Sequence, residues 1–223
     1  MNFITRLNDE LEQYNLLKHD FYQSWSAGCL SSETLQLYAQ EYYKHVAAFP
    51  RYVSAIHSSC EHLPHRQILL ENLIEEEQGE DNHPELWLRF AEKLGCNRLD
   101  MLNEPTLNET RLLVDGYFRL VYQDFATGLG ALYAYERQTP EVAKSKIEGL
   151  QKFYDVNDQR SLKFFTVHLE ADEWHSAECA RIIEELGSRQ QQSVIDGATN
   201  GAKLLWQFLD GMTRSISNAH SGC

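Results

Sequence analysis

Residues that break regular structure are scarce in this chain, and their scarcity limits its possible folds more than any other feature. Five prolines and twelve glycines punctuate 223 residues. Between them run long stretches rich in Leu, Glu, Gln, Ala, Lys and Tyr, in which apolar residues recur three and four positions apart. This spacing is that of an amphipathic α-helix, so the sequence predicts an all-helical protein.

The breaks predict a single-domain bundle of about seven helices plus a short C-terminal helix. The helix that begins near Ser32 contains Pro50, which should kink it because proline lacks an amide donor. The other expected helices cover residues 3–25, 64–79, 82–94, 106–138, 141–153 and 157–187. The glutamine-rich segment 188–194 is interpreted as a linker. The expected organisation is thus one domain over residues 1–187, followed by a linker and an amphipathic helix over 188–223.

Charge and composition exclude several kinds of partner. Lys and Arg total 20 against 33 Asp and Glu, a net charge of -13, so most of the surface should repel nucleic acid and anionic membranes. We find no run of about 18 apolar residues and no secretory signal, which predicts a cytoplasmic protein with no membrane partner. The five cysteines are scattered without a C-x-x-C pair, which argues against a disulfide framework or a zinc knuckle.

Ionisable residues interrupt an apolar stripe on the helix expected over 157–187. His168, Asp172 and His175 are related as i, i+4 and i+7, so they project from one face of that helix. Burial of a charge is costly unless the charge is paired or bound to a metal. These side chains could share one metal ion or two. The alternative is a hydrogen-bonded polar layer inside a helical core.

Other carboxylates and a histidine fall on apolar faces elsewhere. Glu136 continues the inward face of Leu129, Leu132 and Tyr133. The acidic run 71–81 is typical of a solvated surface. However, an apolar stripe enters this run, made of Leu69, Leu70, Leu73 and Ile74. The stripe continues through either Glu76 or Glu77, and the periodicity does not decide which of the two glutamates faces the core. A straight helix would separate Glu76 from His83 by about 10 Å, but the break implied by Gly79 and Pro84 could bring them together. Such a mixed nitrogen and oxygen set suits iron or manganese better than zinc.

Three motifs carry a resemblance to a known family. They are E-E-Q-G-E-D-N-H (76–83), A-L-Y-A-Y-E (131–136) and H-L-E-A-D-E-W-H (168–175). The chain resembles the haem-oxygenase-like di-metal oxidases over residues 2–186. Within them it is most similar to the CADD-like group, named for the chlamydial protein associating with death domains and related to the PqqC and TenA families.

The resemblance implies a haem-oxygenase-like bundle that holds two metal ions, either Fe/Fe or Mn/Fe. It selects Glu76 over Glu77 and implies O2 as co-substrate together with an external reductant. All six of the family's ligand positions match in this sequence: Glu76, His83, Glu136, His168, Asp172 and His175.

The CADD-like group is implicated in forming para-aminobenzoate, a folate precursor, by oxidising and cleaving a tyrosine of the protein itself. Tyr22 and Tyr38 match the tyrosines assigned to that role, and Lys146 matches the lysine proposed as amino donor. Without the resemblance, the two tyrosines would be interpreted as ordinary core residues and Lys146 as a surface residue.

Other functions remain open at this point. The chain could be a di-metal oxygenase acting on an external small molecule, or a PqqC-like or TenA-like enzyme. Its acidic helical surface is also compatible with a protein that binds death domains. An apolar stripe near the C-terminus could dock on the chain's own domain or on a partner subunit: Leu205, Phe208, Leu209 and Met212. A homodimer formed through this stripe is expected.

Overall fold

The computed structural model describes residues 2–103, 105 and 107–220, with the backbone alone described for 170–173 and 216–220. All regular elements in this range are helices, which confirms the all-helical prediction. The α-helices are α1 (Phe3–Leu11), α2 (Asp20–Ser26), α3 (Ser32–Ser59), α4 (Leu63–Glu77), α5 (His83–Lys93), α6 (Arg98–Met101), α7 (Asn108–Gln123), α8 (Phe125–Glu136), α9 (Thr139–Phe153), α10 (Gln159–Glu185) and α11 (Ser188–His220). Two 3₁₀ turns, η1 (Glu12–Tyr14) and η2 (Leu16–Lys18), connect α1 to α2.

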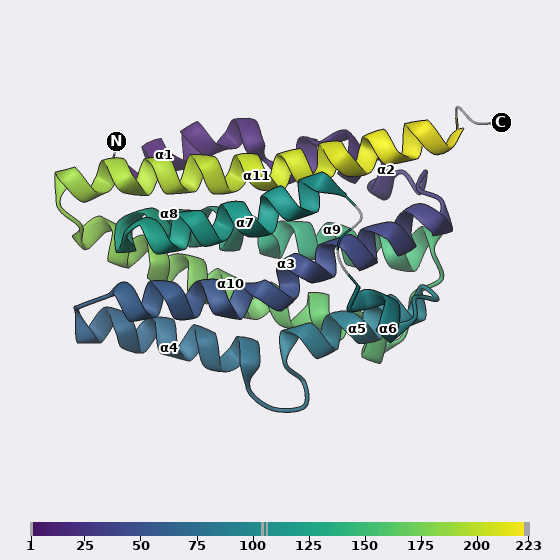
Figure 1. Cartoon of the computed structure of the whole chain (residues 1–223), viewed down its shortest axis with the longest axis horizontal. Coiled ribbons are helices and arrows are strands. Elements are labelled where there is room, and N and C mark those ends of the chain that lie inside the picture. Colours follow the sequence, from purple (N-terminus) through teal and green to yellow (C-terminus); the bar gives the residue numbers. More distant parts are fainter. Residues whose placement is uncertain (1, 104, 106, 221–223) are drawn as a thin grey trace.

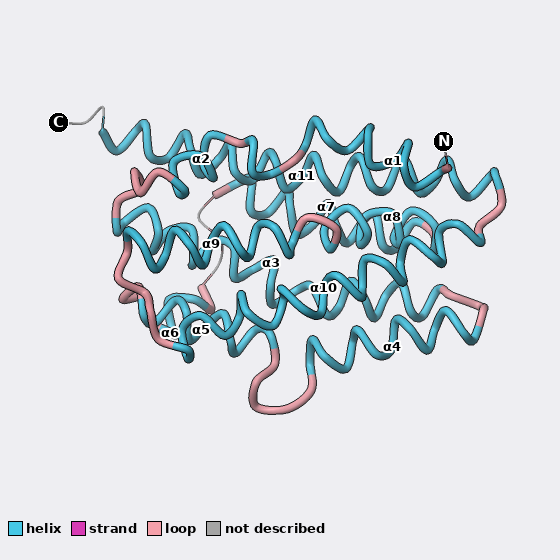
Figure 2. Tube along the Cα trace, turned by 180° about the vertical axis from the view of Figure 1, so that it is seen from behind, coloured by secondary structure: helices cyan, strands magenta, loops and turns pink. Residues whose placement is uncertain are grey.

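The long helices lie side by side in one bundle (Figure 1). Helices α1 and α11 run along one edge, α4 runs along the opposite edge, and α3, α7, α8 and α10 lie between them, as the view from behind also shows (Figure 2). Helix α11 packs mainly on α8 and α7, and α10 packs on α9, α5 and α8. The core between them is rich in aromatic side chains, including fully buried Trp25, Tyr38, Tyr52, Trp87 and Tyr117.

Side-chain caps explain where many of these helices begin. An Asn, Ser or Asp side chain accepts a hydrogen bond from a backbone amide in the first turn, which satisfies a donor that the helix itself leaves open. The residues that cap α1, α3, α5, α6, α8 and α10 in this way are Asn2, Ser31, Asn82, Asn97, Asp124 and Asp158. Local sequence therefore sets these boundaries.

Two of the expected helices are broken, which corrects their predicted boundaries and the helix number. The segment 3–25 forms α1, two 3₁₀ turns and α2 rather than one helix. The segment 106–138 divides into α7 and α8 at Asp124, whose backbone is extended (φ -163°, ψ 165°) and whose carboxylate accepts from the amide of Thr127 at 2.9 Å. Because each of these two segments is divided, the bundle contains more helices than the expected seven plus a C-terminal helix.

The C-terminal segment also differs from the prediction. Residues 188–194 form the first turns of the long helix α11, not a linker. The apolar stripe Leu205, Phe208, Leu209 and Met212 is buried within the chain's own bundle, which is one of the two docking modes expected of it, so it does not offer a surface for a homodimer. A homodimer through another surface stays a prediction. A hydrophobic stripe satisfied inside the fold has no need of a partner subunit. In the part of the chain that the structure describes, no helix is both long and apolar enough to cross a membrane.

Candidate metal centre

Three of the expected metal ligands converge in the core from three different helices. Glu76 lies in the last turn of α4, His83 begins α5, and His168 lies near the middle of α10. Each offers a ligand atom within 4.8 Å of the other two, and all three side chains are buried. Glu77, the alternative that the periodicity left open, is exposed. The structure thus distinguishes between the two neighbouring glutamates and places Glu76 in the site.

A tight turn after α4 brings His83 back to Glu76. His83 Nδ1 lies 2.8 Å from Glu76 Oε2, a separation far shorter than a straight helix would allow. Gly79 has φ +84°, a conformation that favours glycine because it has no Cβ. Asn82 then stabilises both sides of the turn, since its side chain donates to the carbonyl of Gly79 at 2.8 Å and accepts from the amide of Glu85 at 3.0 Å.

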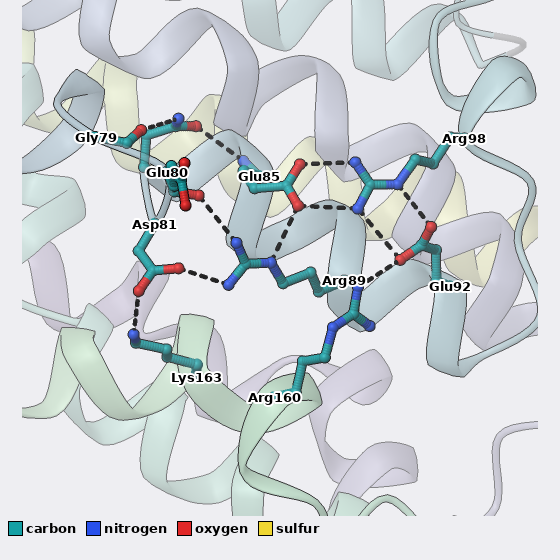
Figure 3. A network of polar contacts seen from close by, with 10 residues as sticks. Gly79, Glu80, Asp81, Glu85, Arg89, Glu92, Arg98, Arg160 and Lys163 are labelled. Atoms are coloured by element: carbon teal, nitrogen blue, oxygen red, sulfur yellow. Dashed lines mark hydrogen bonds and ion pairs between the residues drawn. The ribbon is translucent and has the colours of Figure 1, made fainter.

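A network of ion pairs on the surface fixes this turn to the helices around it (Figure 3). Arg89 pairs with Asp81 at 2.6 Å and donates to the carbonyl of Glu80 at 2.9 Å. Lys163 of α10 pairs with the same Asp81, which connects the turn to the helix that carries His168. Single surface ion pairs contribute little, but a network of bidentate contacts can hold a loop in register. The turn that positions His83 is therefore anchored on two sides.

The electrostatics of the three residues suit a bound cation. Burial alone would raise the pKa of Glu76, but the surrounding imidazoles, chiefly that of His83, hold the pKa of this carboxyl below its ordinary value. His168 Nδ1 contacts the carbonyl of Phe164 at 2.5 Å, so this nitrogen carries the proton and leaves the Nε2 lone pair for a metal. One carboxylate and two imidazoles form a donor set that fits iron or manganese.

The remaining expected ligands are arranged differently. Glu136 and His175 are buried, and His175 is close enough to Glu76 to contribute to its lowered pKa. His175 Nε2 lies 3.2 Å from Oε2 of half-exposed Glu75. The side chain of Asp172 lies outside the described residues. The described part of the site thus groups Glu76, His83 and His168, with Glu136 and His175 in the same core but in contact with other side chains.

Two residues that the sequence reasoning missed hold the carboxylate of Glu136. Asn72 donates to its Oε1, and the thiol of Cys179 donates to its Oε2 at 3.3 Å. Asn72 precedes Glu76 by four residues and Cys179 follows His175 by four, so each shares a helix face with an expected ligand. That spacing is a signal that could have identified both. Groups of this kind orient metal ligands in proteins.

The residues expected to take part in tyrosine chemistry lie together beside the metal centre. The hydroxyl groups of Tyr22 and Tyr38 are 3.2 Å apart, and both side chains are buried. Burial raises the pKa of each phenol well above its ordinary value, so both stay protonated. Tyr22, Lys146 and His168 all line one buried chamber with a free volume of about 20 Å³.

Lys146 is a core residue, which corrects the surface interpretation of it. Its side chain is 4% exposed, and its Nζ lies 5.1 to 5.6 Å from the centroids of five aromatic rings: Tyr22, Tyr38, Tyr42, Trp87 and Phe165. Burial deprives the ammonium of water and lowers the pKa of Lys146 to about 7. A large share of the amine is therefore uncharged near neutral pH, and an uncharged amine can act as a nucleophile.

Comparisons with known proteins indicate the family and the fold of the chain. A family model described as an iron-containing redox enzyme matches residues 36–206. A 4-aminobenzoate synthase of Chlamydia pneumoniae is 39% identical over 96% of both chains. Another 4-aminobenzoate synthase, from Nitrosomonas europaea, is 38% identical over 94% of this chain and 90% of the relative. The crystal structure of a TenA homologue from Pseudomonas syringae superposes with a TM-score of 0.82 at 17% identity, covering 95% of this chain and 93% of that one.

Proposed function

Because this chain belongs to the family of iron-containing redox enzymes, we propose that it forms 4-aminobenzoate from its own Tyr22, with O2 as oxidant at a pair of metal ions. The names of its relatives support the product, since 4-aminobenzoate synthases are 37 to 39% identical over most of the chain. The metal pair is Fe/Fe or Mn/Fe, held by the triad Glu76, His83 and His168 together with Glu136, His175 and Asp172. When bound, such a pair supplies activation of O2 and a one-electron oxidant for phenols.

One observation carries the proposal for the ring. The amine of Lys146 and the phenol of Tyr22 share a narrow chamber with His168, and that chamber has a free volume of about 20 Å³. This volume is close to what a single water molecule requires, so with the Tyr22 ring in place the chamber can admit O2 but has no room for an external aromatic substrate. An aromatic product formed in this chamber would therefore take its ring from the protein.

The chemistry of the product agrees with the positions of these residues. In tyrosine the hydroxyl group is para to Cβ, and in 4-aminobenzoate the amine is para to the carboxylate. Cleavage of the bond between Cα and Cβ of Tyr22, with O2 as the oxidant, would leave Cβ oxidised from a methylene to the carboxylate carbon. An amine would replace the phenolic oxygen, which leaves as water, and transfer of its nitrogen requires cleavage of the donor's own carbon–nitrogen bond. Lys146, with its Nζ 5.6 Å from the centroid of the Tyr22 ring, is the proposed amine donor.

The surrounding residues orient the ring and exclude water. Tyr38 makes the hydrogen bond to Tyr22 and stacks on Tyr42, with ring centroids 5.4 Å apart and an interplanar angle of 17°. The hydroxyl of Tyr42 in turn donates to that of Tyr135 at 3.3 Å. This series of buried phenols begins at Tyr22 and ends at Tyr135, the residue that precedes Glu136 in α8, so it could pass an electron between the ring and the proposed metal pair. The hydroxyl groups of Tyr22 and Tyr38 and those of Tyr42 and Tyr135 are paired by hydrogen bonds along which a proton can move, whereas Tyr38 and Tyr42 are in ring contact.

Metal content is the first quantity to measure. Protein produced with iron and manganese supplied should contain about two ions per chain by elemental analysis, the stoichiometry expected of a dinuclear carboxylate and histidine site. A variant that combines His168→Ala with His175→Ala should lose them. Metal content equal to that of the variant under every loading condition would refute the metal-dependent function.

Isotope labelling then tests the origin of the ring. Protein made with ring-labelled tyrosine, loaded with metal, reduced and exposed to O2, should release labelled 4-aminobenzoate. Mass spectrometry of the peptide containing Tyr22 should show loss of the side chain in a matching amount. Unlabelled product that appears only when an external substrate is added would support the alternative of an oxygenase acting on a small molecule.

A further inference from the structure

A second hollow adjoins the buried chamber and opens to the surface. It is a cleft of about 310 Å³ between the 3₁₀ turns η1 and η2 and the junction of α8 with α9. The side chains of Gln138 and Val142 line both the cleft and the chamber. These two residues therefore form a thin wall between the chamber that contains Tyr22 and the surface.

Gln138 closes this wall by bridging two backbone segments. Its side-chain oxygen accepts from the amide of Leu16 at 2.9 Å, and its nitrogen donates to the carbonyl of Ala134 at 3.1 Å. Leu16 belongs to η2, a single 3₁₀ turn whose hydrogen-bond geometry is poorer than that of an α-helix. Rotation of one side chain and a shift of one short turn would thus connect the chamber with the cleft.

The guanidinium of Arg137 lines the cleft and supplies a positive charge there. It also interacts with Tyr133 and lies close enough to Glu12 to lower the pKa of that carboxyl. Its Nη1 is buried and has no hydrogen-bond partner among the residues that the structure describes, so a side-chain rotation would bring this donor to a bound carboxylate. The carboxylate of Glu12 lines the same cleft but is engaged by Lys18 at 2.9 Å and by Asn15 at 3.1 Å. A guanidinium binds a planar carboxylate through two parallel hydrogen bonds. Glu141 lines the cleft as well, and its carboxylate can accept from an aromatic amine.

We propose that this cleft binds an aromatic carboxylate anchored by Arg137, and that Gln138 is the gate through which the acid passes from the chamber. The choice of ligand rests on the proposed function, because an aromatic acid formed at Tyr22 would have to cross the lining of the chamber to reach solvent. The cleft, at about 310 Å³, is within the size range of sites for small molecules.

Titration of 4-aminobenzoate into the metal-free, full-length chain tests the binding site without any turnover. One saturable site is expected by calorimetry, and Arg137→Gln should weaken it about tenfold by removing a charge-assisted contact. Arg119→Gln is the matched control, because Arg119 lines a separate cleft of about 270 Å³ between α7 and α11. Equal affinity of Arg137→Gln and wild type, or no saturable binding by the wild type, would overturn the proposal.

A second experiment tests the gate. Metal-loaded protein is exposed to O2 and passed rapidly over a desalting column, and the acid is measured in the protein fraction and in the small-molecule fraction after denaturation. Gln138→Ala should increase the released share of the product relative to the wild type. If Gln138→Ala and the wild type release the same share of the product, the proposed role of Gln138 as a gate is wrong. Absence of product from denatured wild-type protein would instead contradict the proposed function, while the titration would still decide the binding site.

Discussion

The phenolic hydroxyl groups of Tyr22 and Tyr38 lie 3.2 Å apart in a part of the core that water does not reach. Only Tyr22 also lines the chamber that contains Lys146 and His168. The two phenols are therefore partners in one hydrogen bond but are placed differently toward the proposed chemistry.

Substitution of each tyrosine by phenylalanine should separate these roles. Tyr22→Phe should abolish 4-aminobenzoate formation, because the ring would lack its oxidisable hydroxyl. Tyr38→Phe should reduce the rate but still allow loss of the Tyr22 side chain. Each variant should lose about 1 kcal/mol of unfolding free energy with the hydrogen bond, measurable by denaturant titration. Full activity of Tyr22→Phe would exclude Tyr22 as the source of the ring.

The buried Lys146 should make stability depend on pH in the alkaline range. Its pKa is about 7 in the folded chain and about 10.5 when unfolded, so between these values the unfolded state binds the extra proton. The unfolding free energy should therefore rise from about pH 7 to about pH 10.5. Lys146→Met should gain on the order of 5 kcal/mol at pH 6, with the gain shrinking across that window.

Chemical denaturation at a series of pH values measures this effect. Lys144→Met is the matched control, because Lys144 lies on the exposed face of the same helix. A gain for Lys146→Met that stays constant from pH 6 to pH 10 would show that loss of packing strain, and not the buried amine, is responsible.

His45 should cause a loss of stability in acid. It is fully buried among aromatic rings, and neither ring nitrogen has a hydrogen-bond partner within the described part of the chain. Burial lowers the pKa of His45 to about 3. Between about pH 6.5 and pH 3 the unfolded chain therefore binds a proton at His45 that the folded chain does not bind, and the unfolding free energy falls. His45→Phe should be less sensitive to acid between pH 6.5 and 3, and His62→Phe, at an exposed site, should unfold like the wild type.

The side chains that hold Glu136 should affect metal affinity. Asn72→Leu and Cys179→Ala each remove one donor to its carboxylate, and changes of this kind weaken metal binding by about 10–100-fold. Cys179→Ser keeps a donor and should restore much of the affinity. Metal titration followed by spectroscopy provides the measurement, with Cys60→Ala as a buried control outside the site. Unaltered affinity in both Asn72→Leu and Cys179→Ala would show that Glu136 needs no support from them.

Close packing of α11 on α8 should make Gly197 intolerant of any side chain. A Cβ at this position would lie 1.9 Å from the carbonyl oxygen of Thr127, so the two helices would have to separate. Gly197→Ala should lower the unfolding free energy by about 1–3 kcal/mol. At Gly187 the nearest atom would lie 3.9 Å away, so Gly187→Ala should change the melting temperature little. Equal melting temperatures of both variants and wild type would contradict the packing of α11 on the bundle.

The sequence by itself determined the helical class and most of the candidate site residues, because both depend on local spacing. The three-and-four period predicts helices wherever caps and breaks allow them. The same period shows that His168, Glu136 and one of two adjacent glutamates interrupt apolar faces. The resemblance of three motifs then indicated the metal set and the roles of Tyr22 and Lys146. Local signals were misleading where a cap was overlooked, as at Asp124 between α7 and α8.

Only the tertiary structure decided which residues meet. Glu76, His83 and His168 belong to three helices, and their convergence depends on a turn held by Arg89 and Lys163 from outside it. Burial of Lys146 follows from five rings that α2, α3, α5 and α10 bring around one amine. The sequence also could not predict that α11 packs on its own bundle. An amphipathic stripe shows that one face of a helix must be buried, but it does not show which surface buries that face.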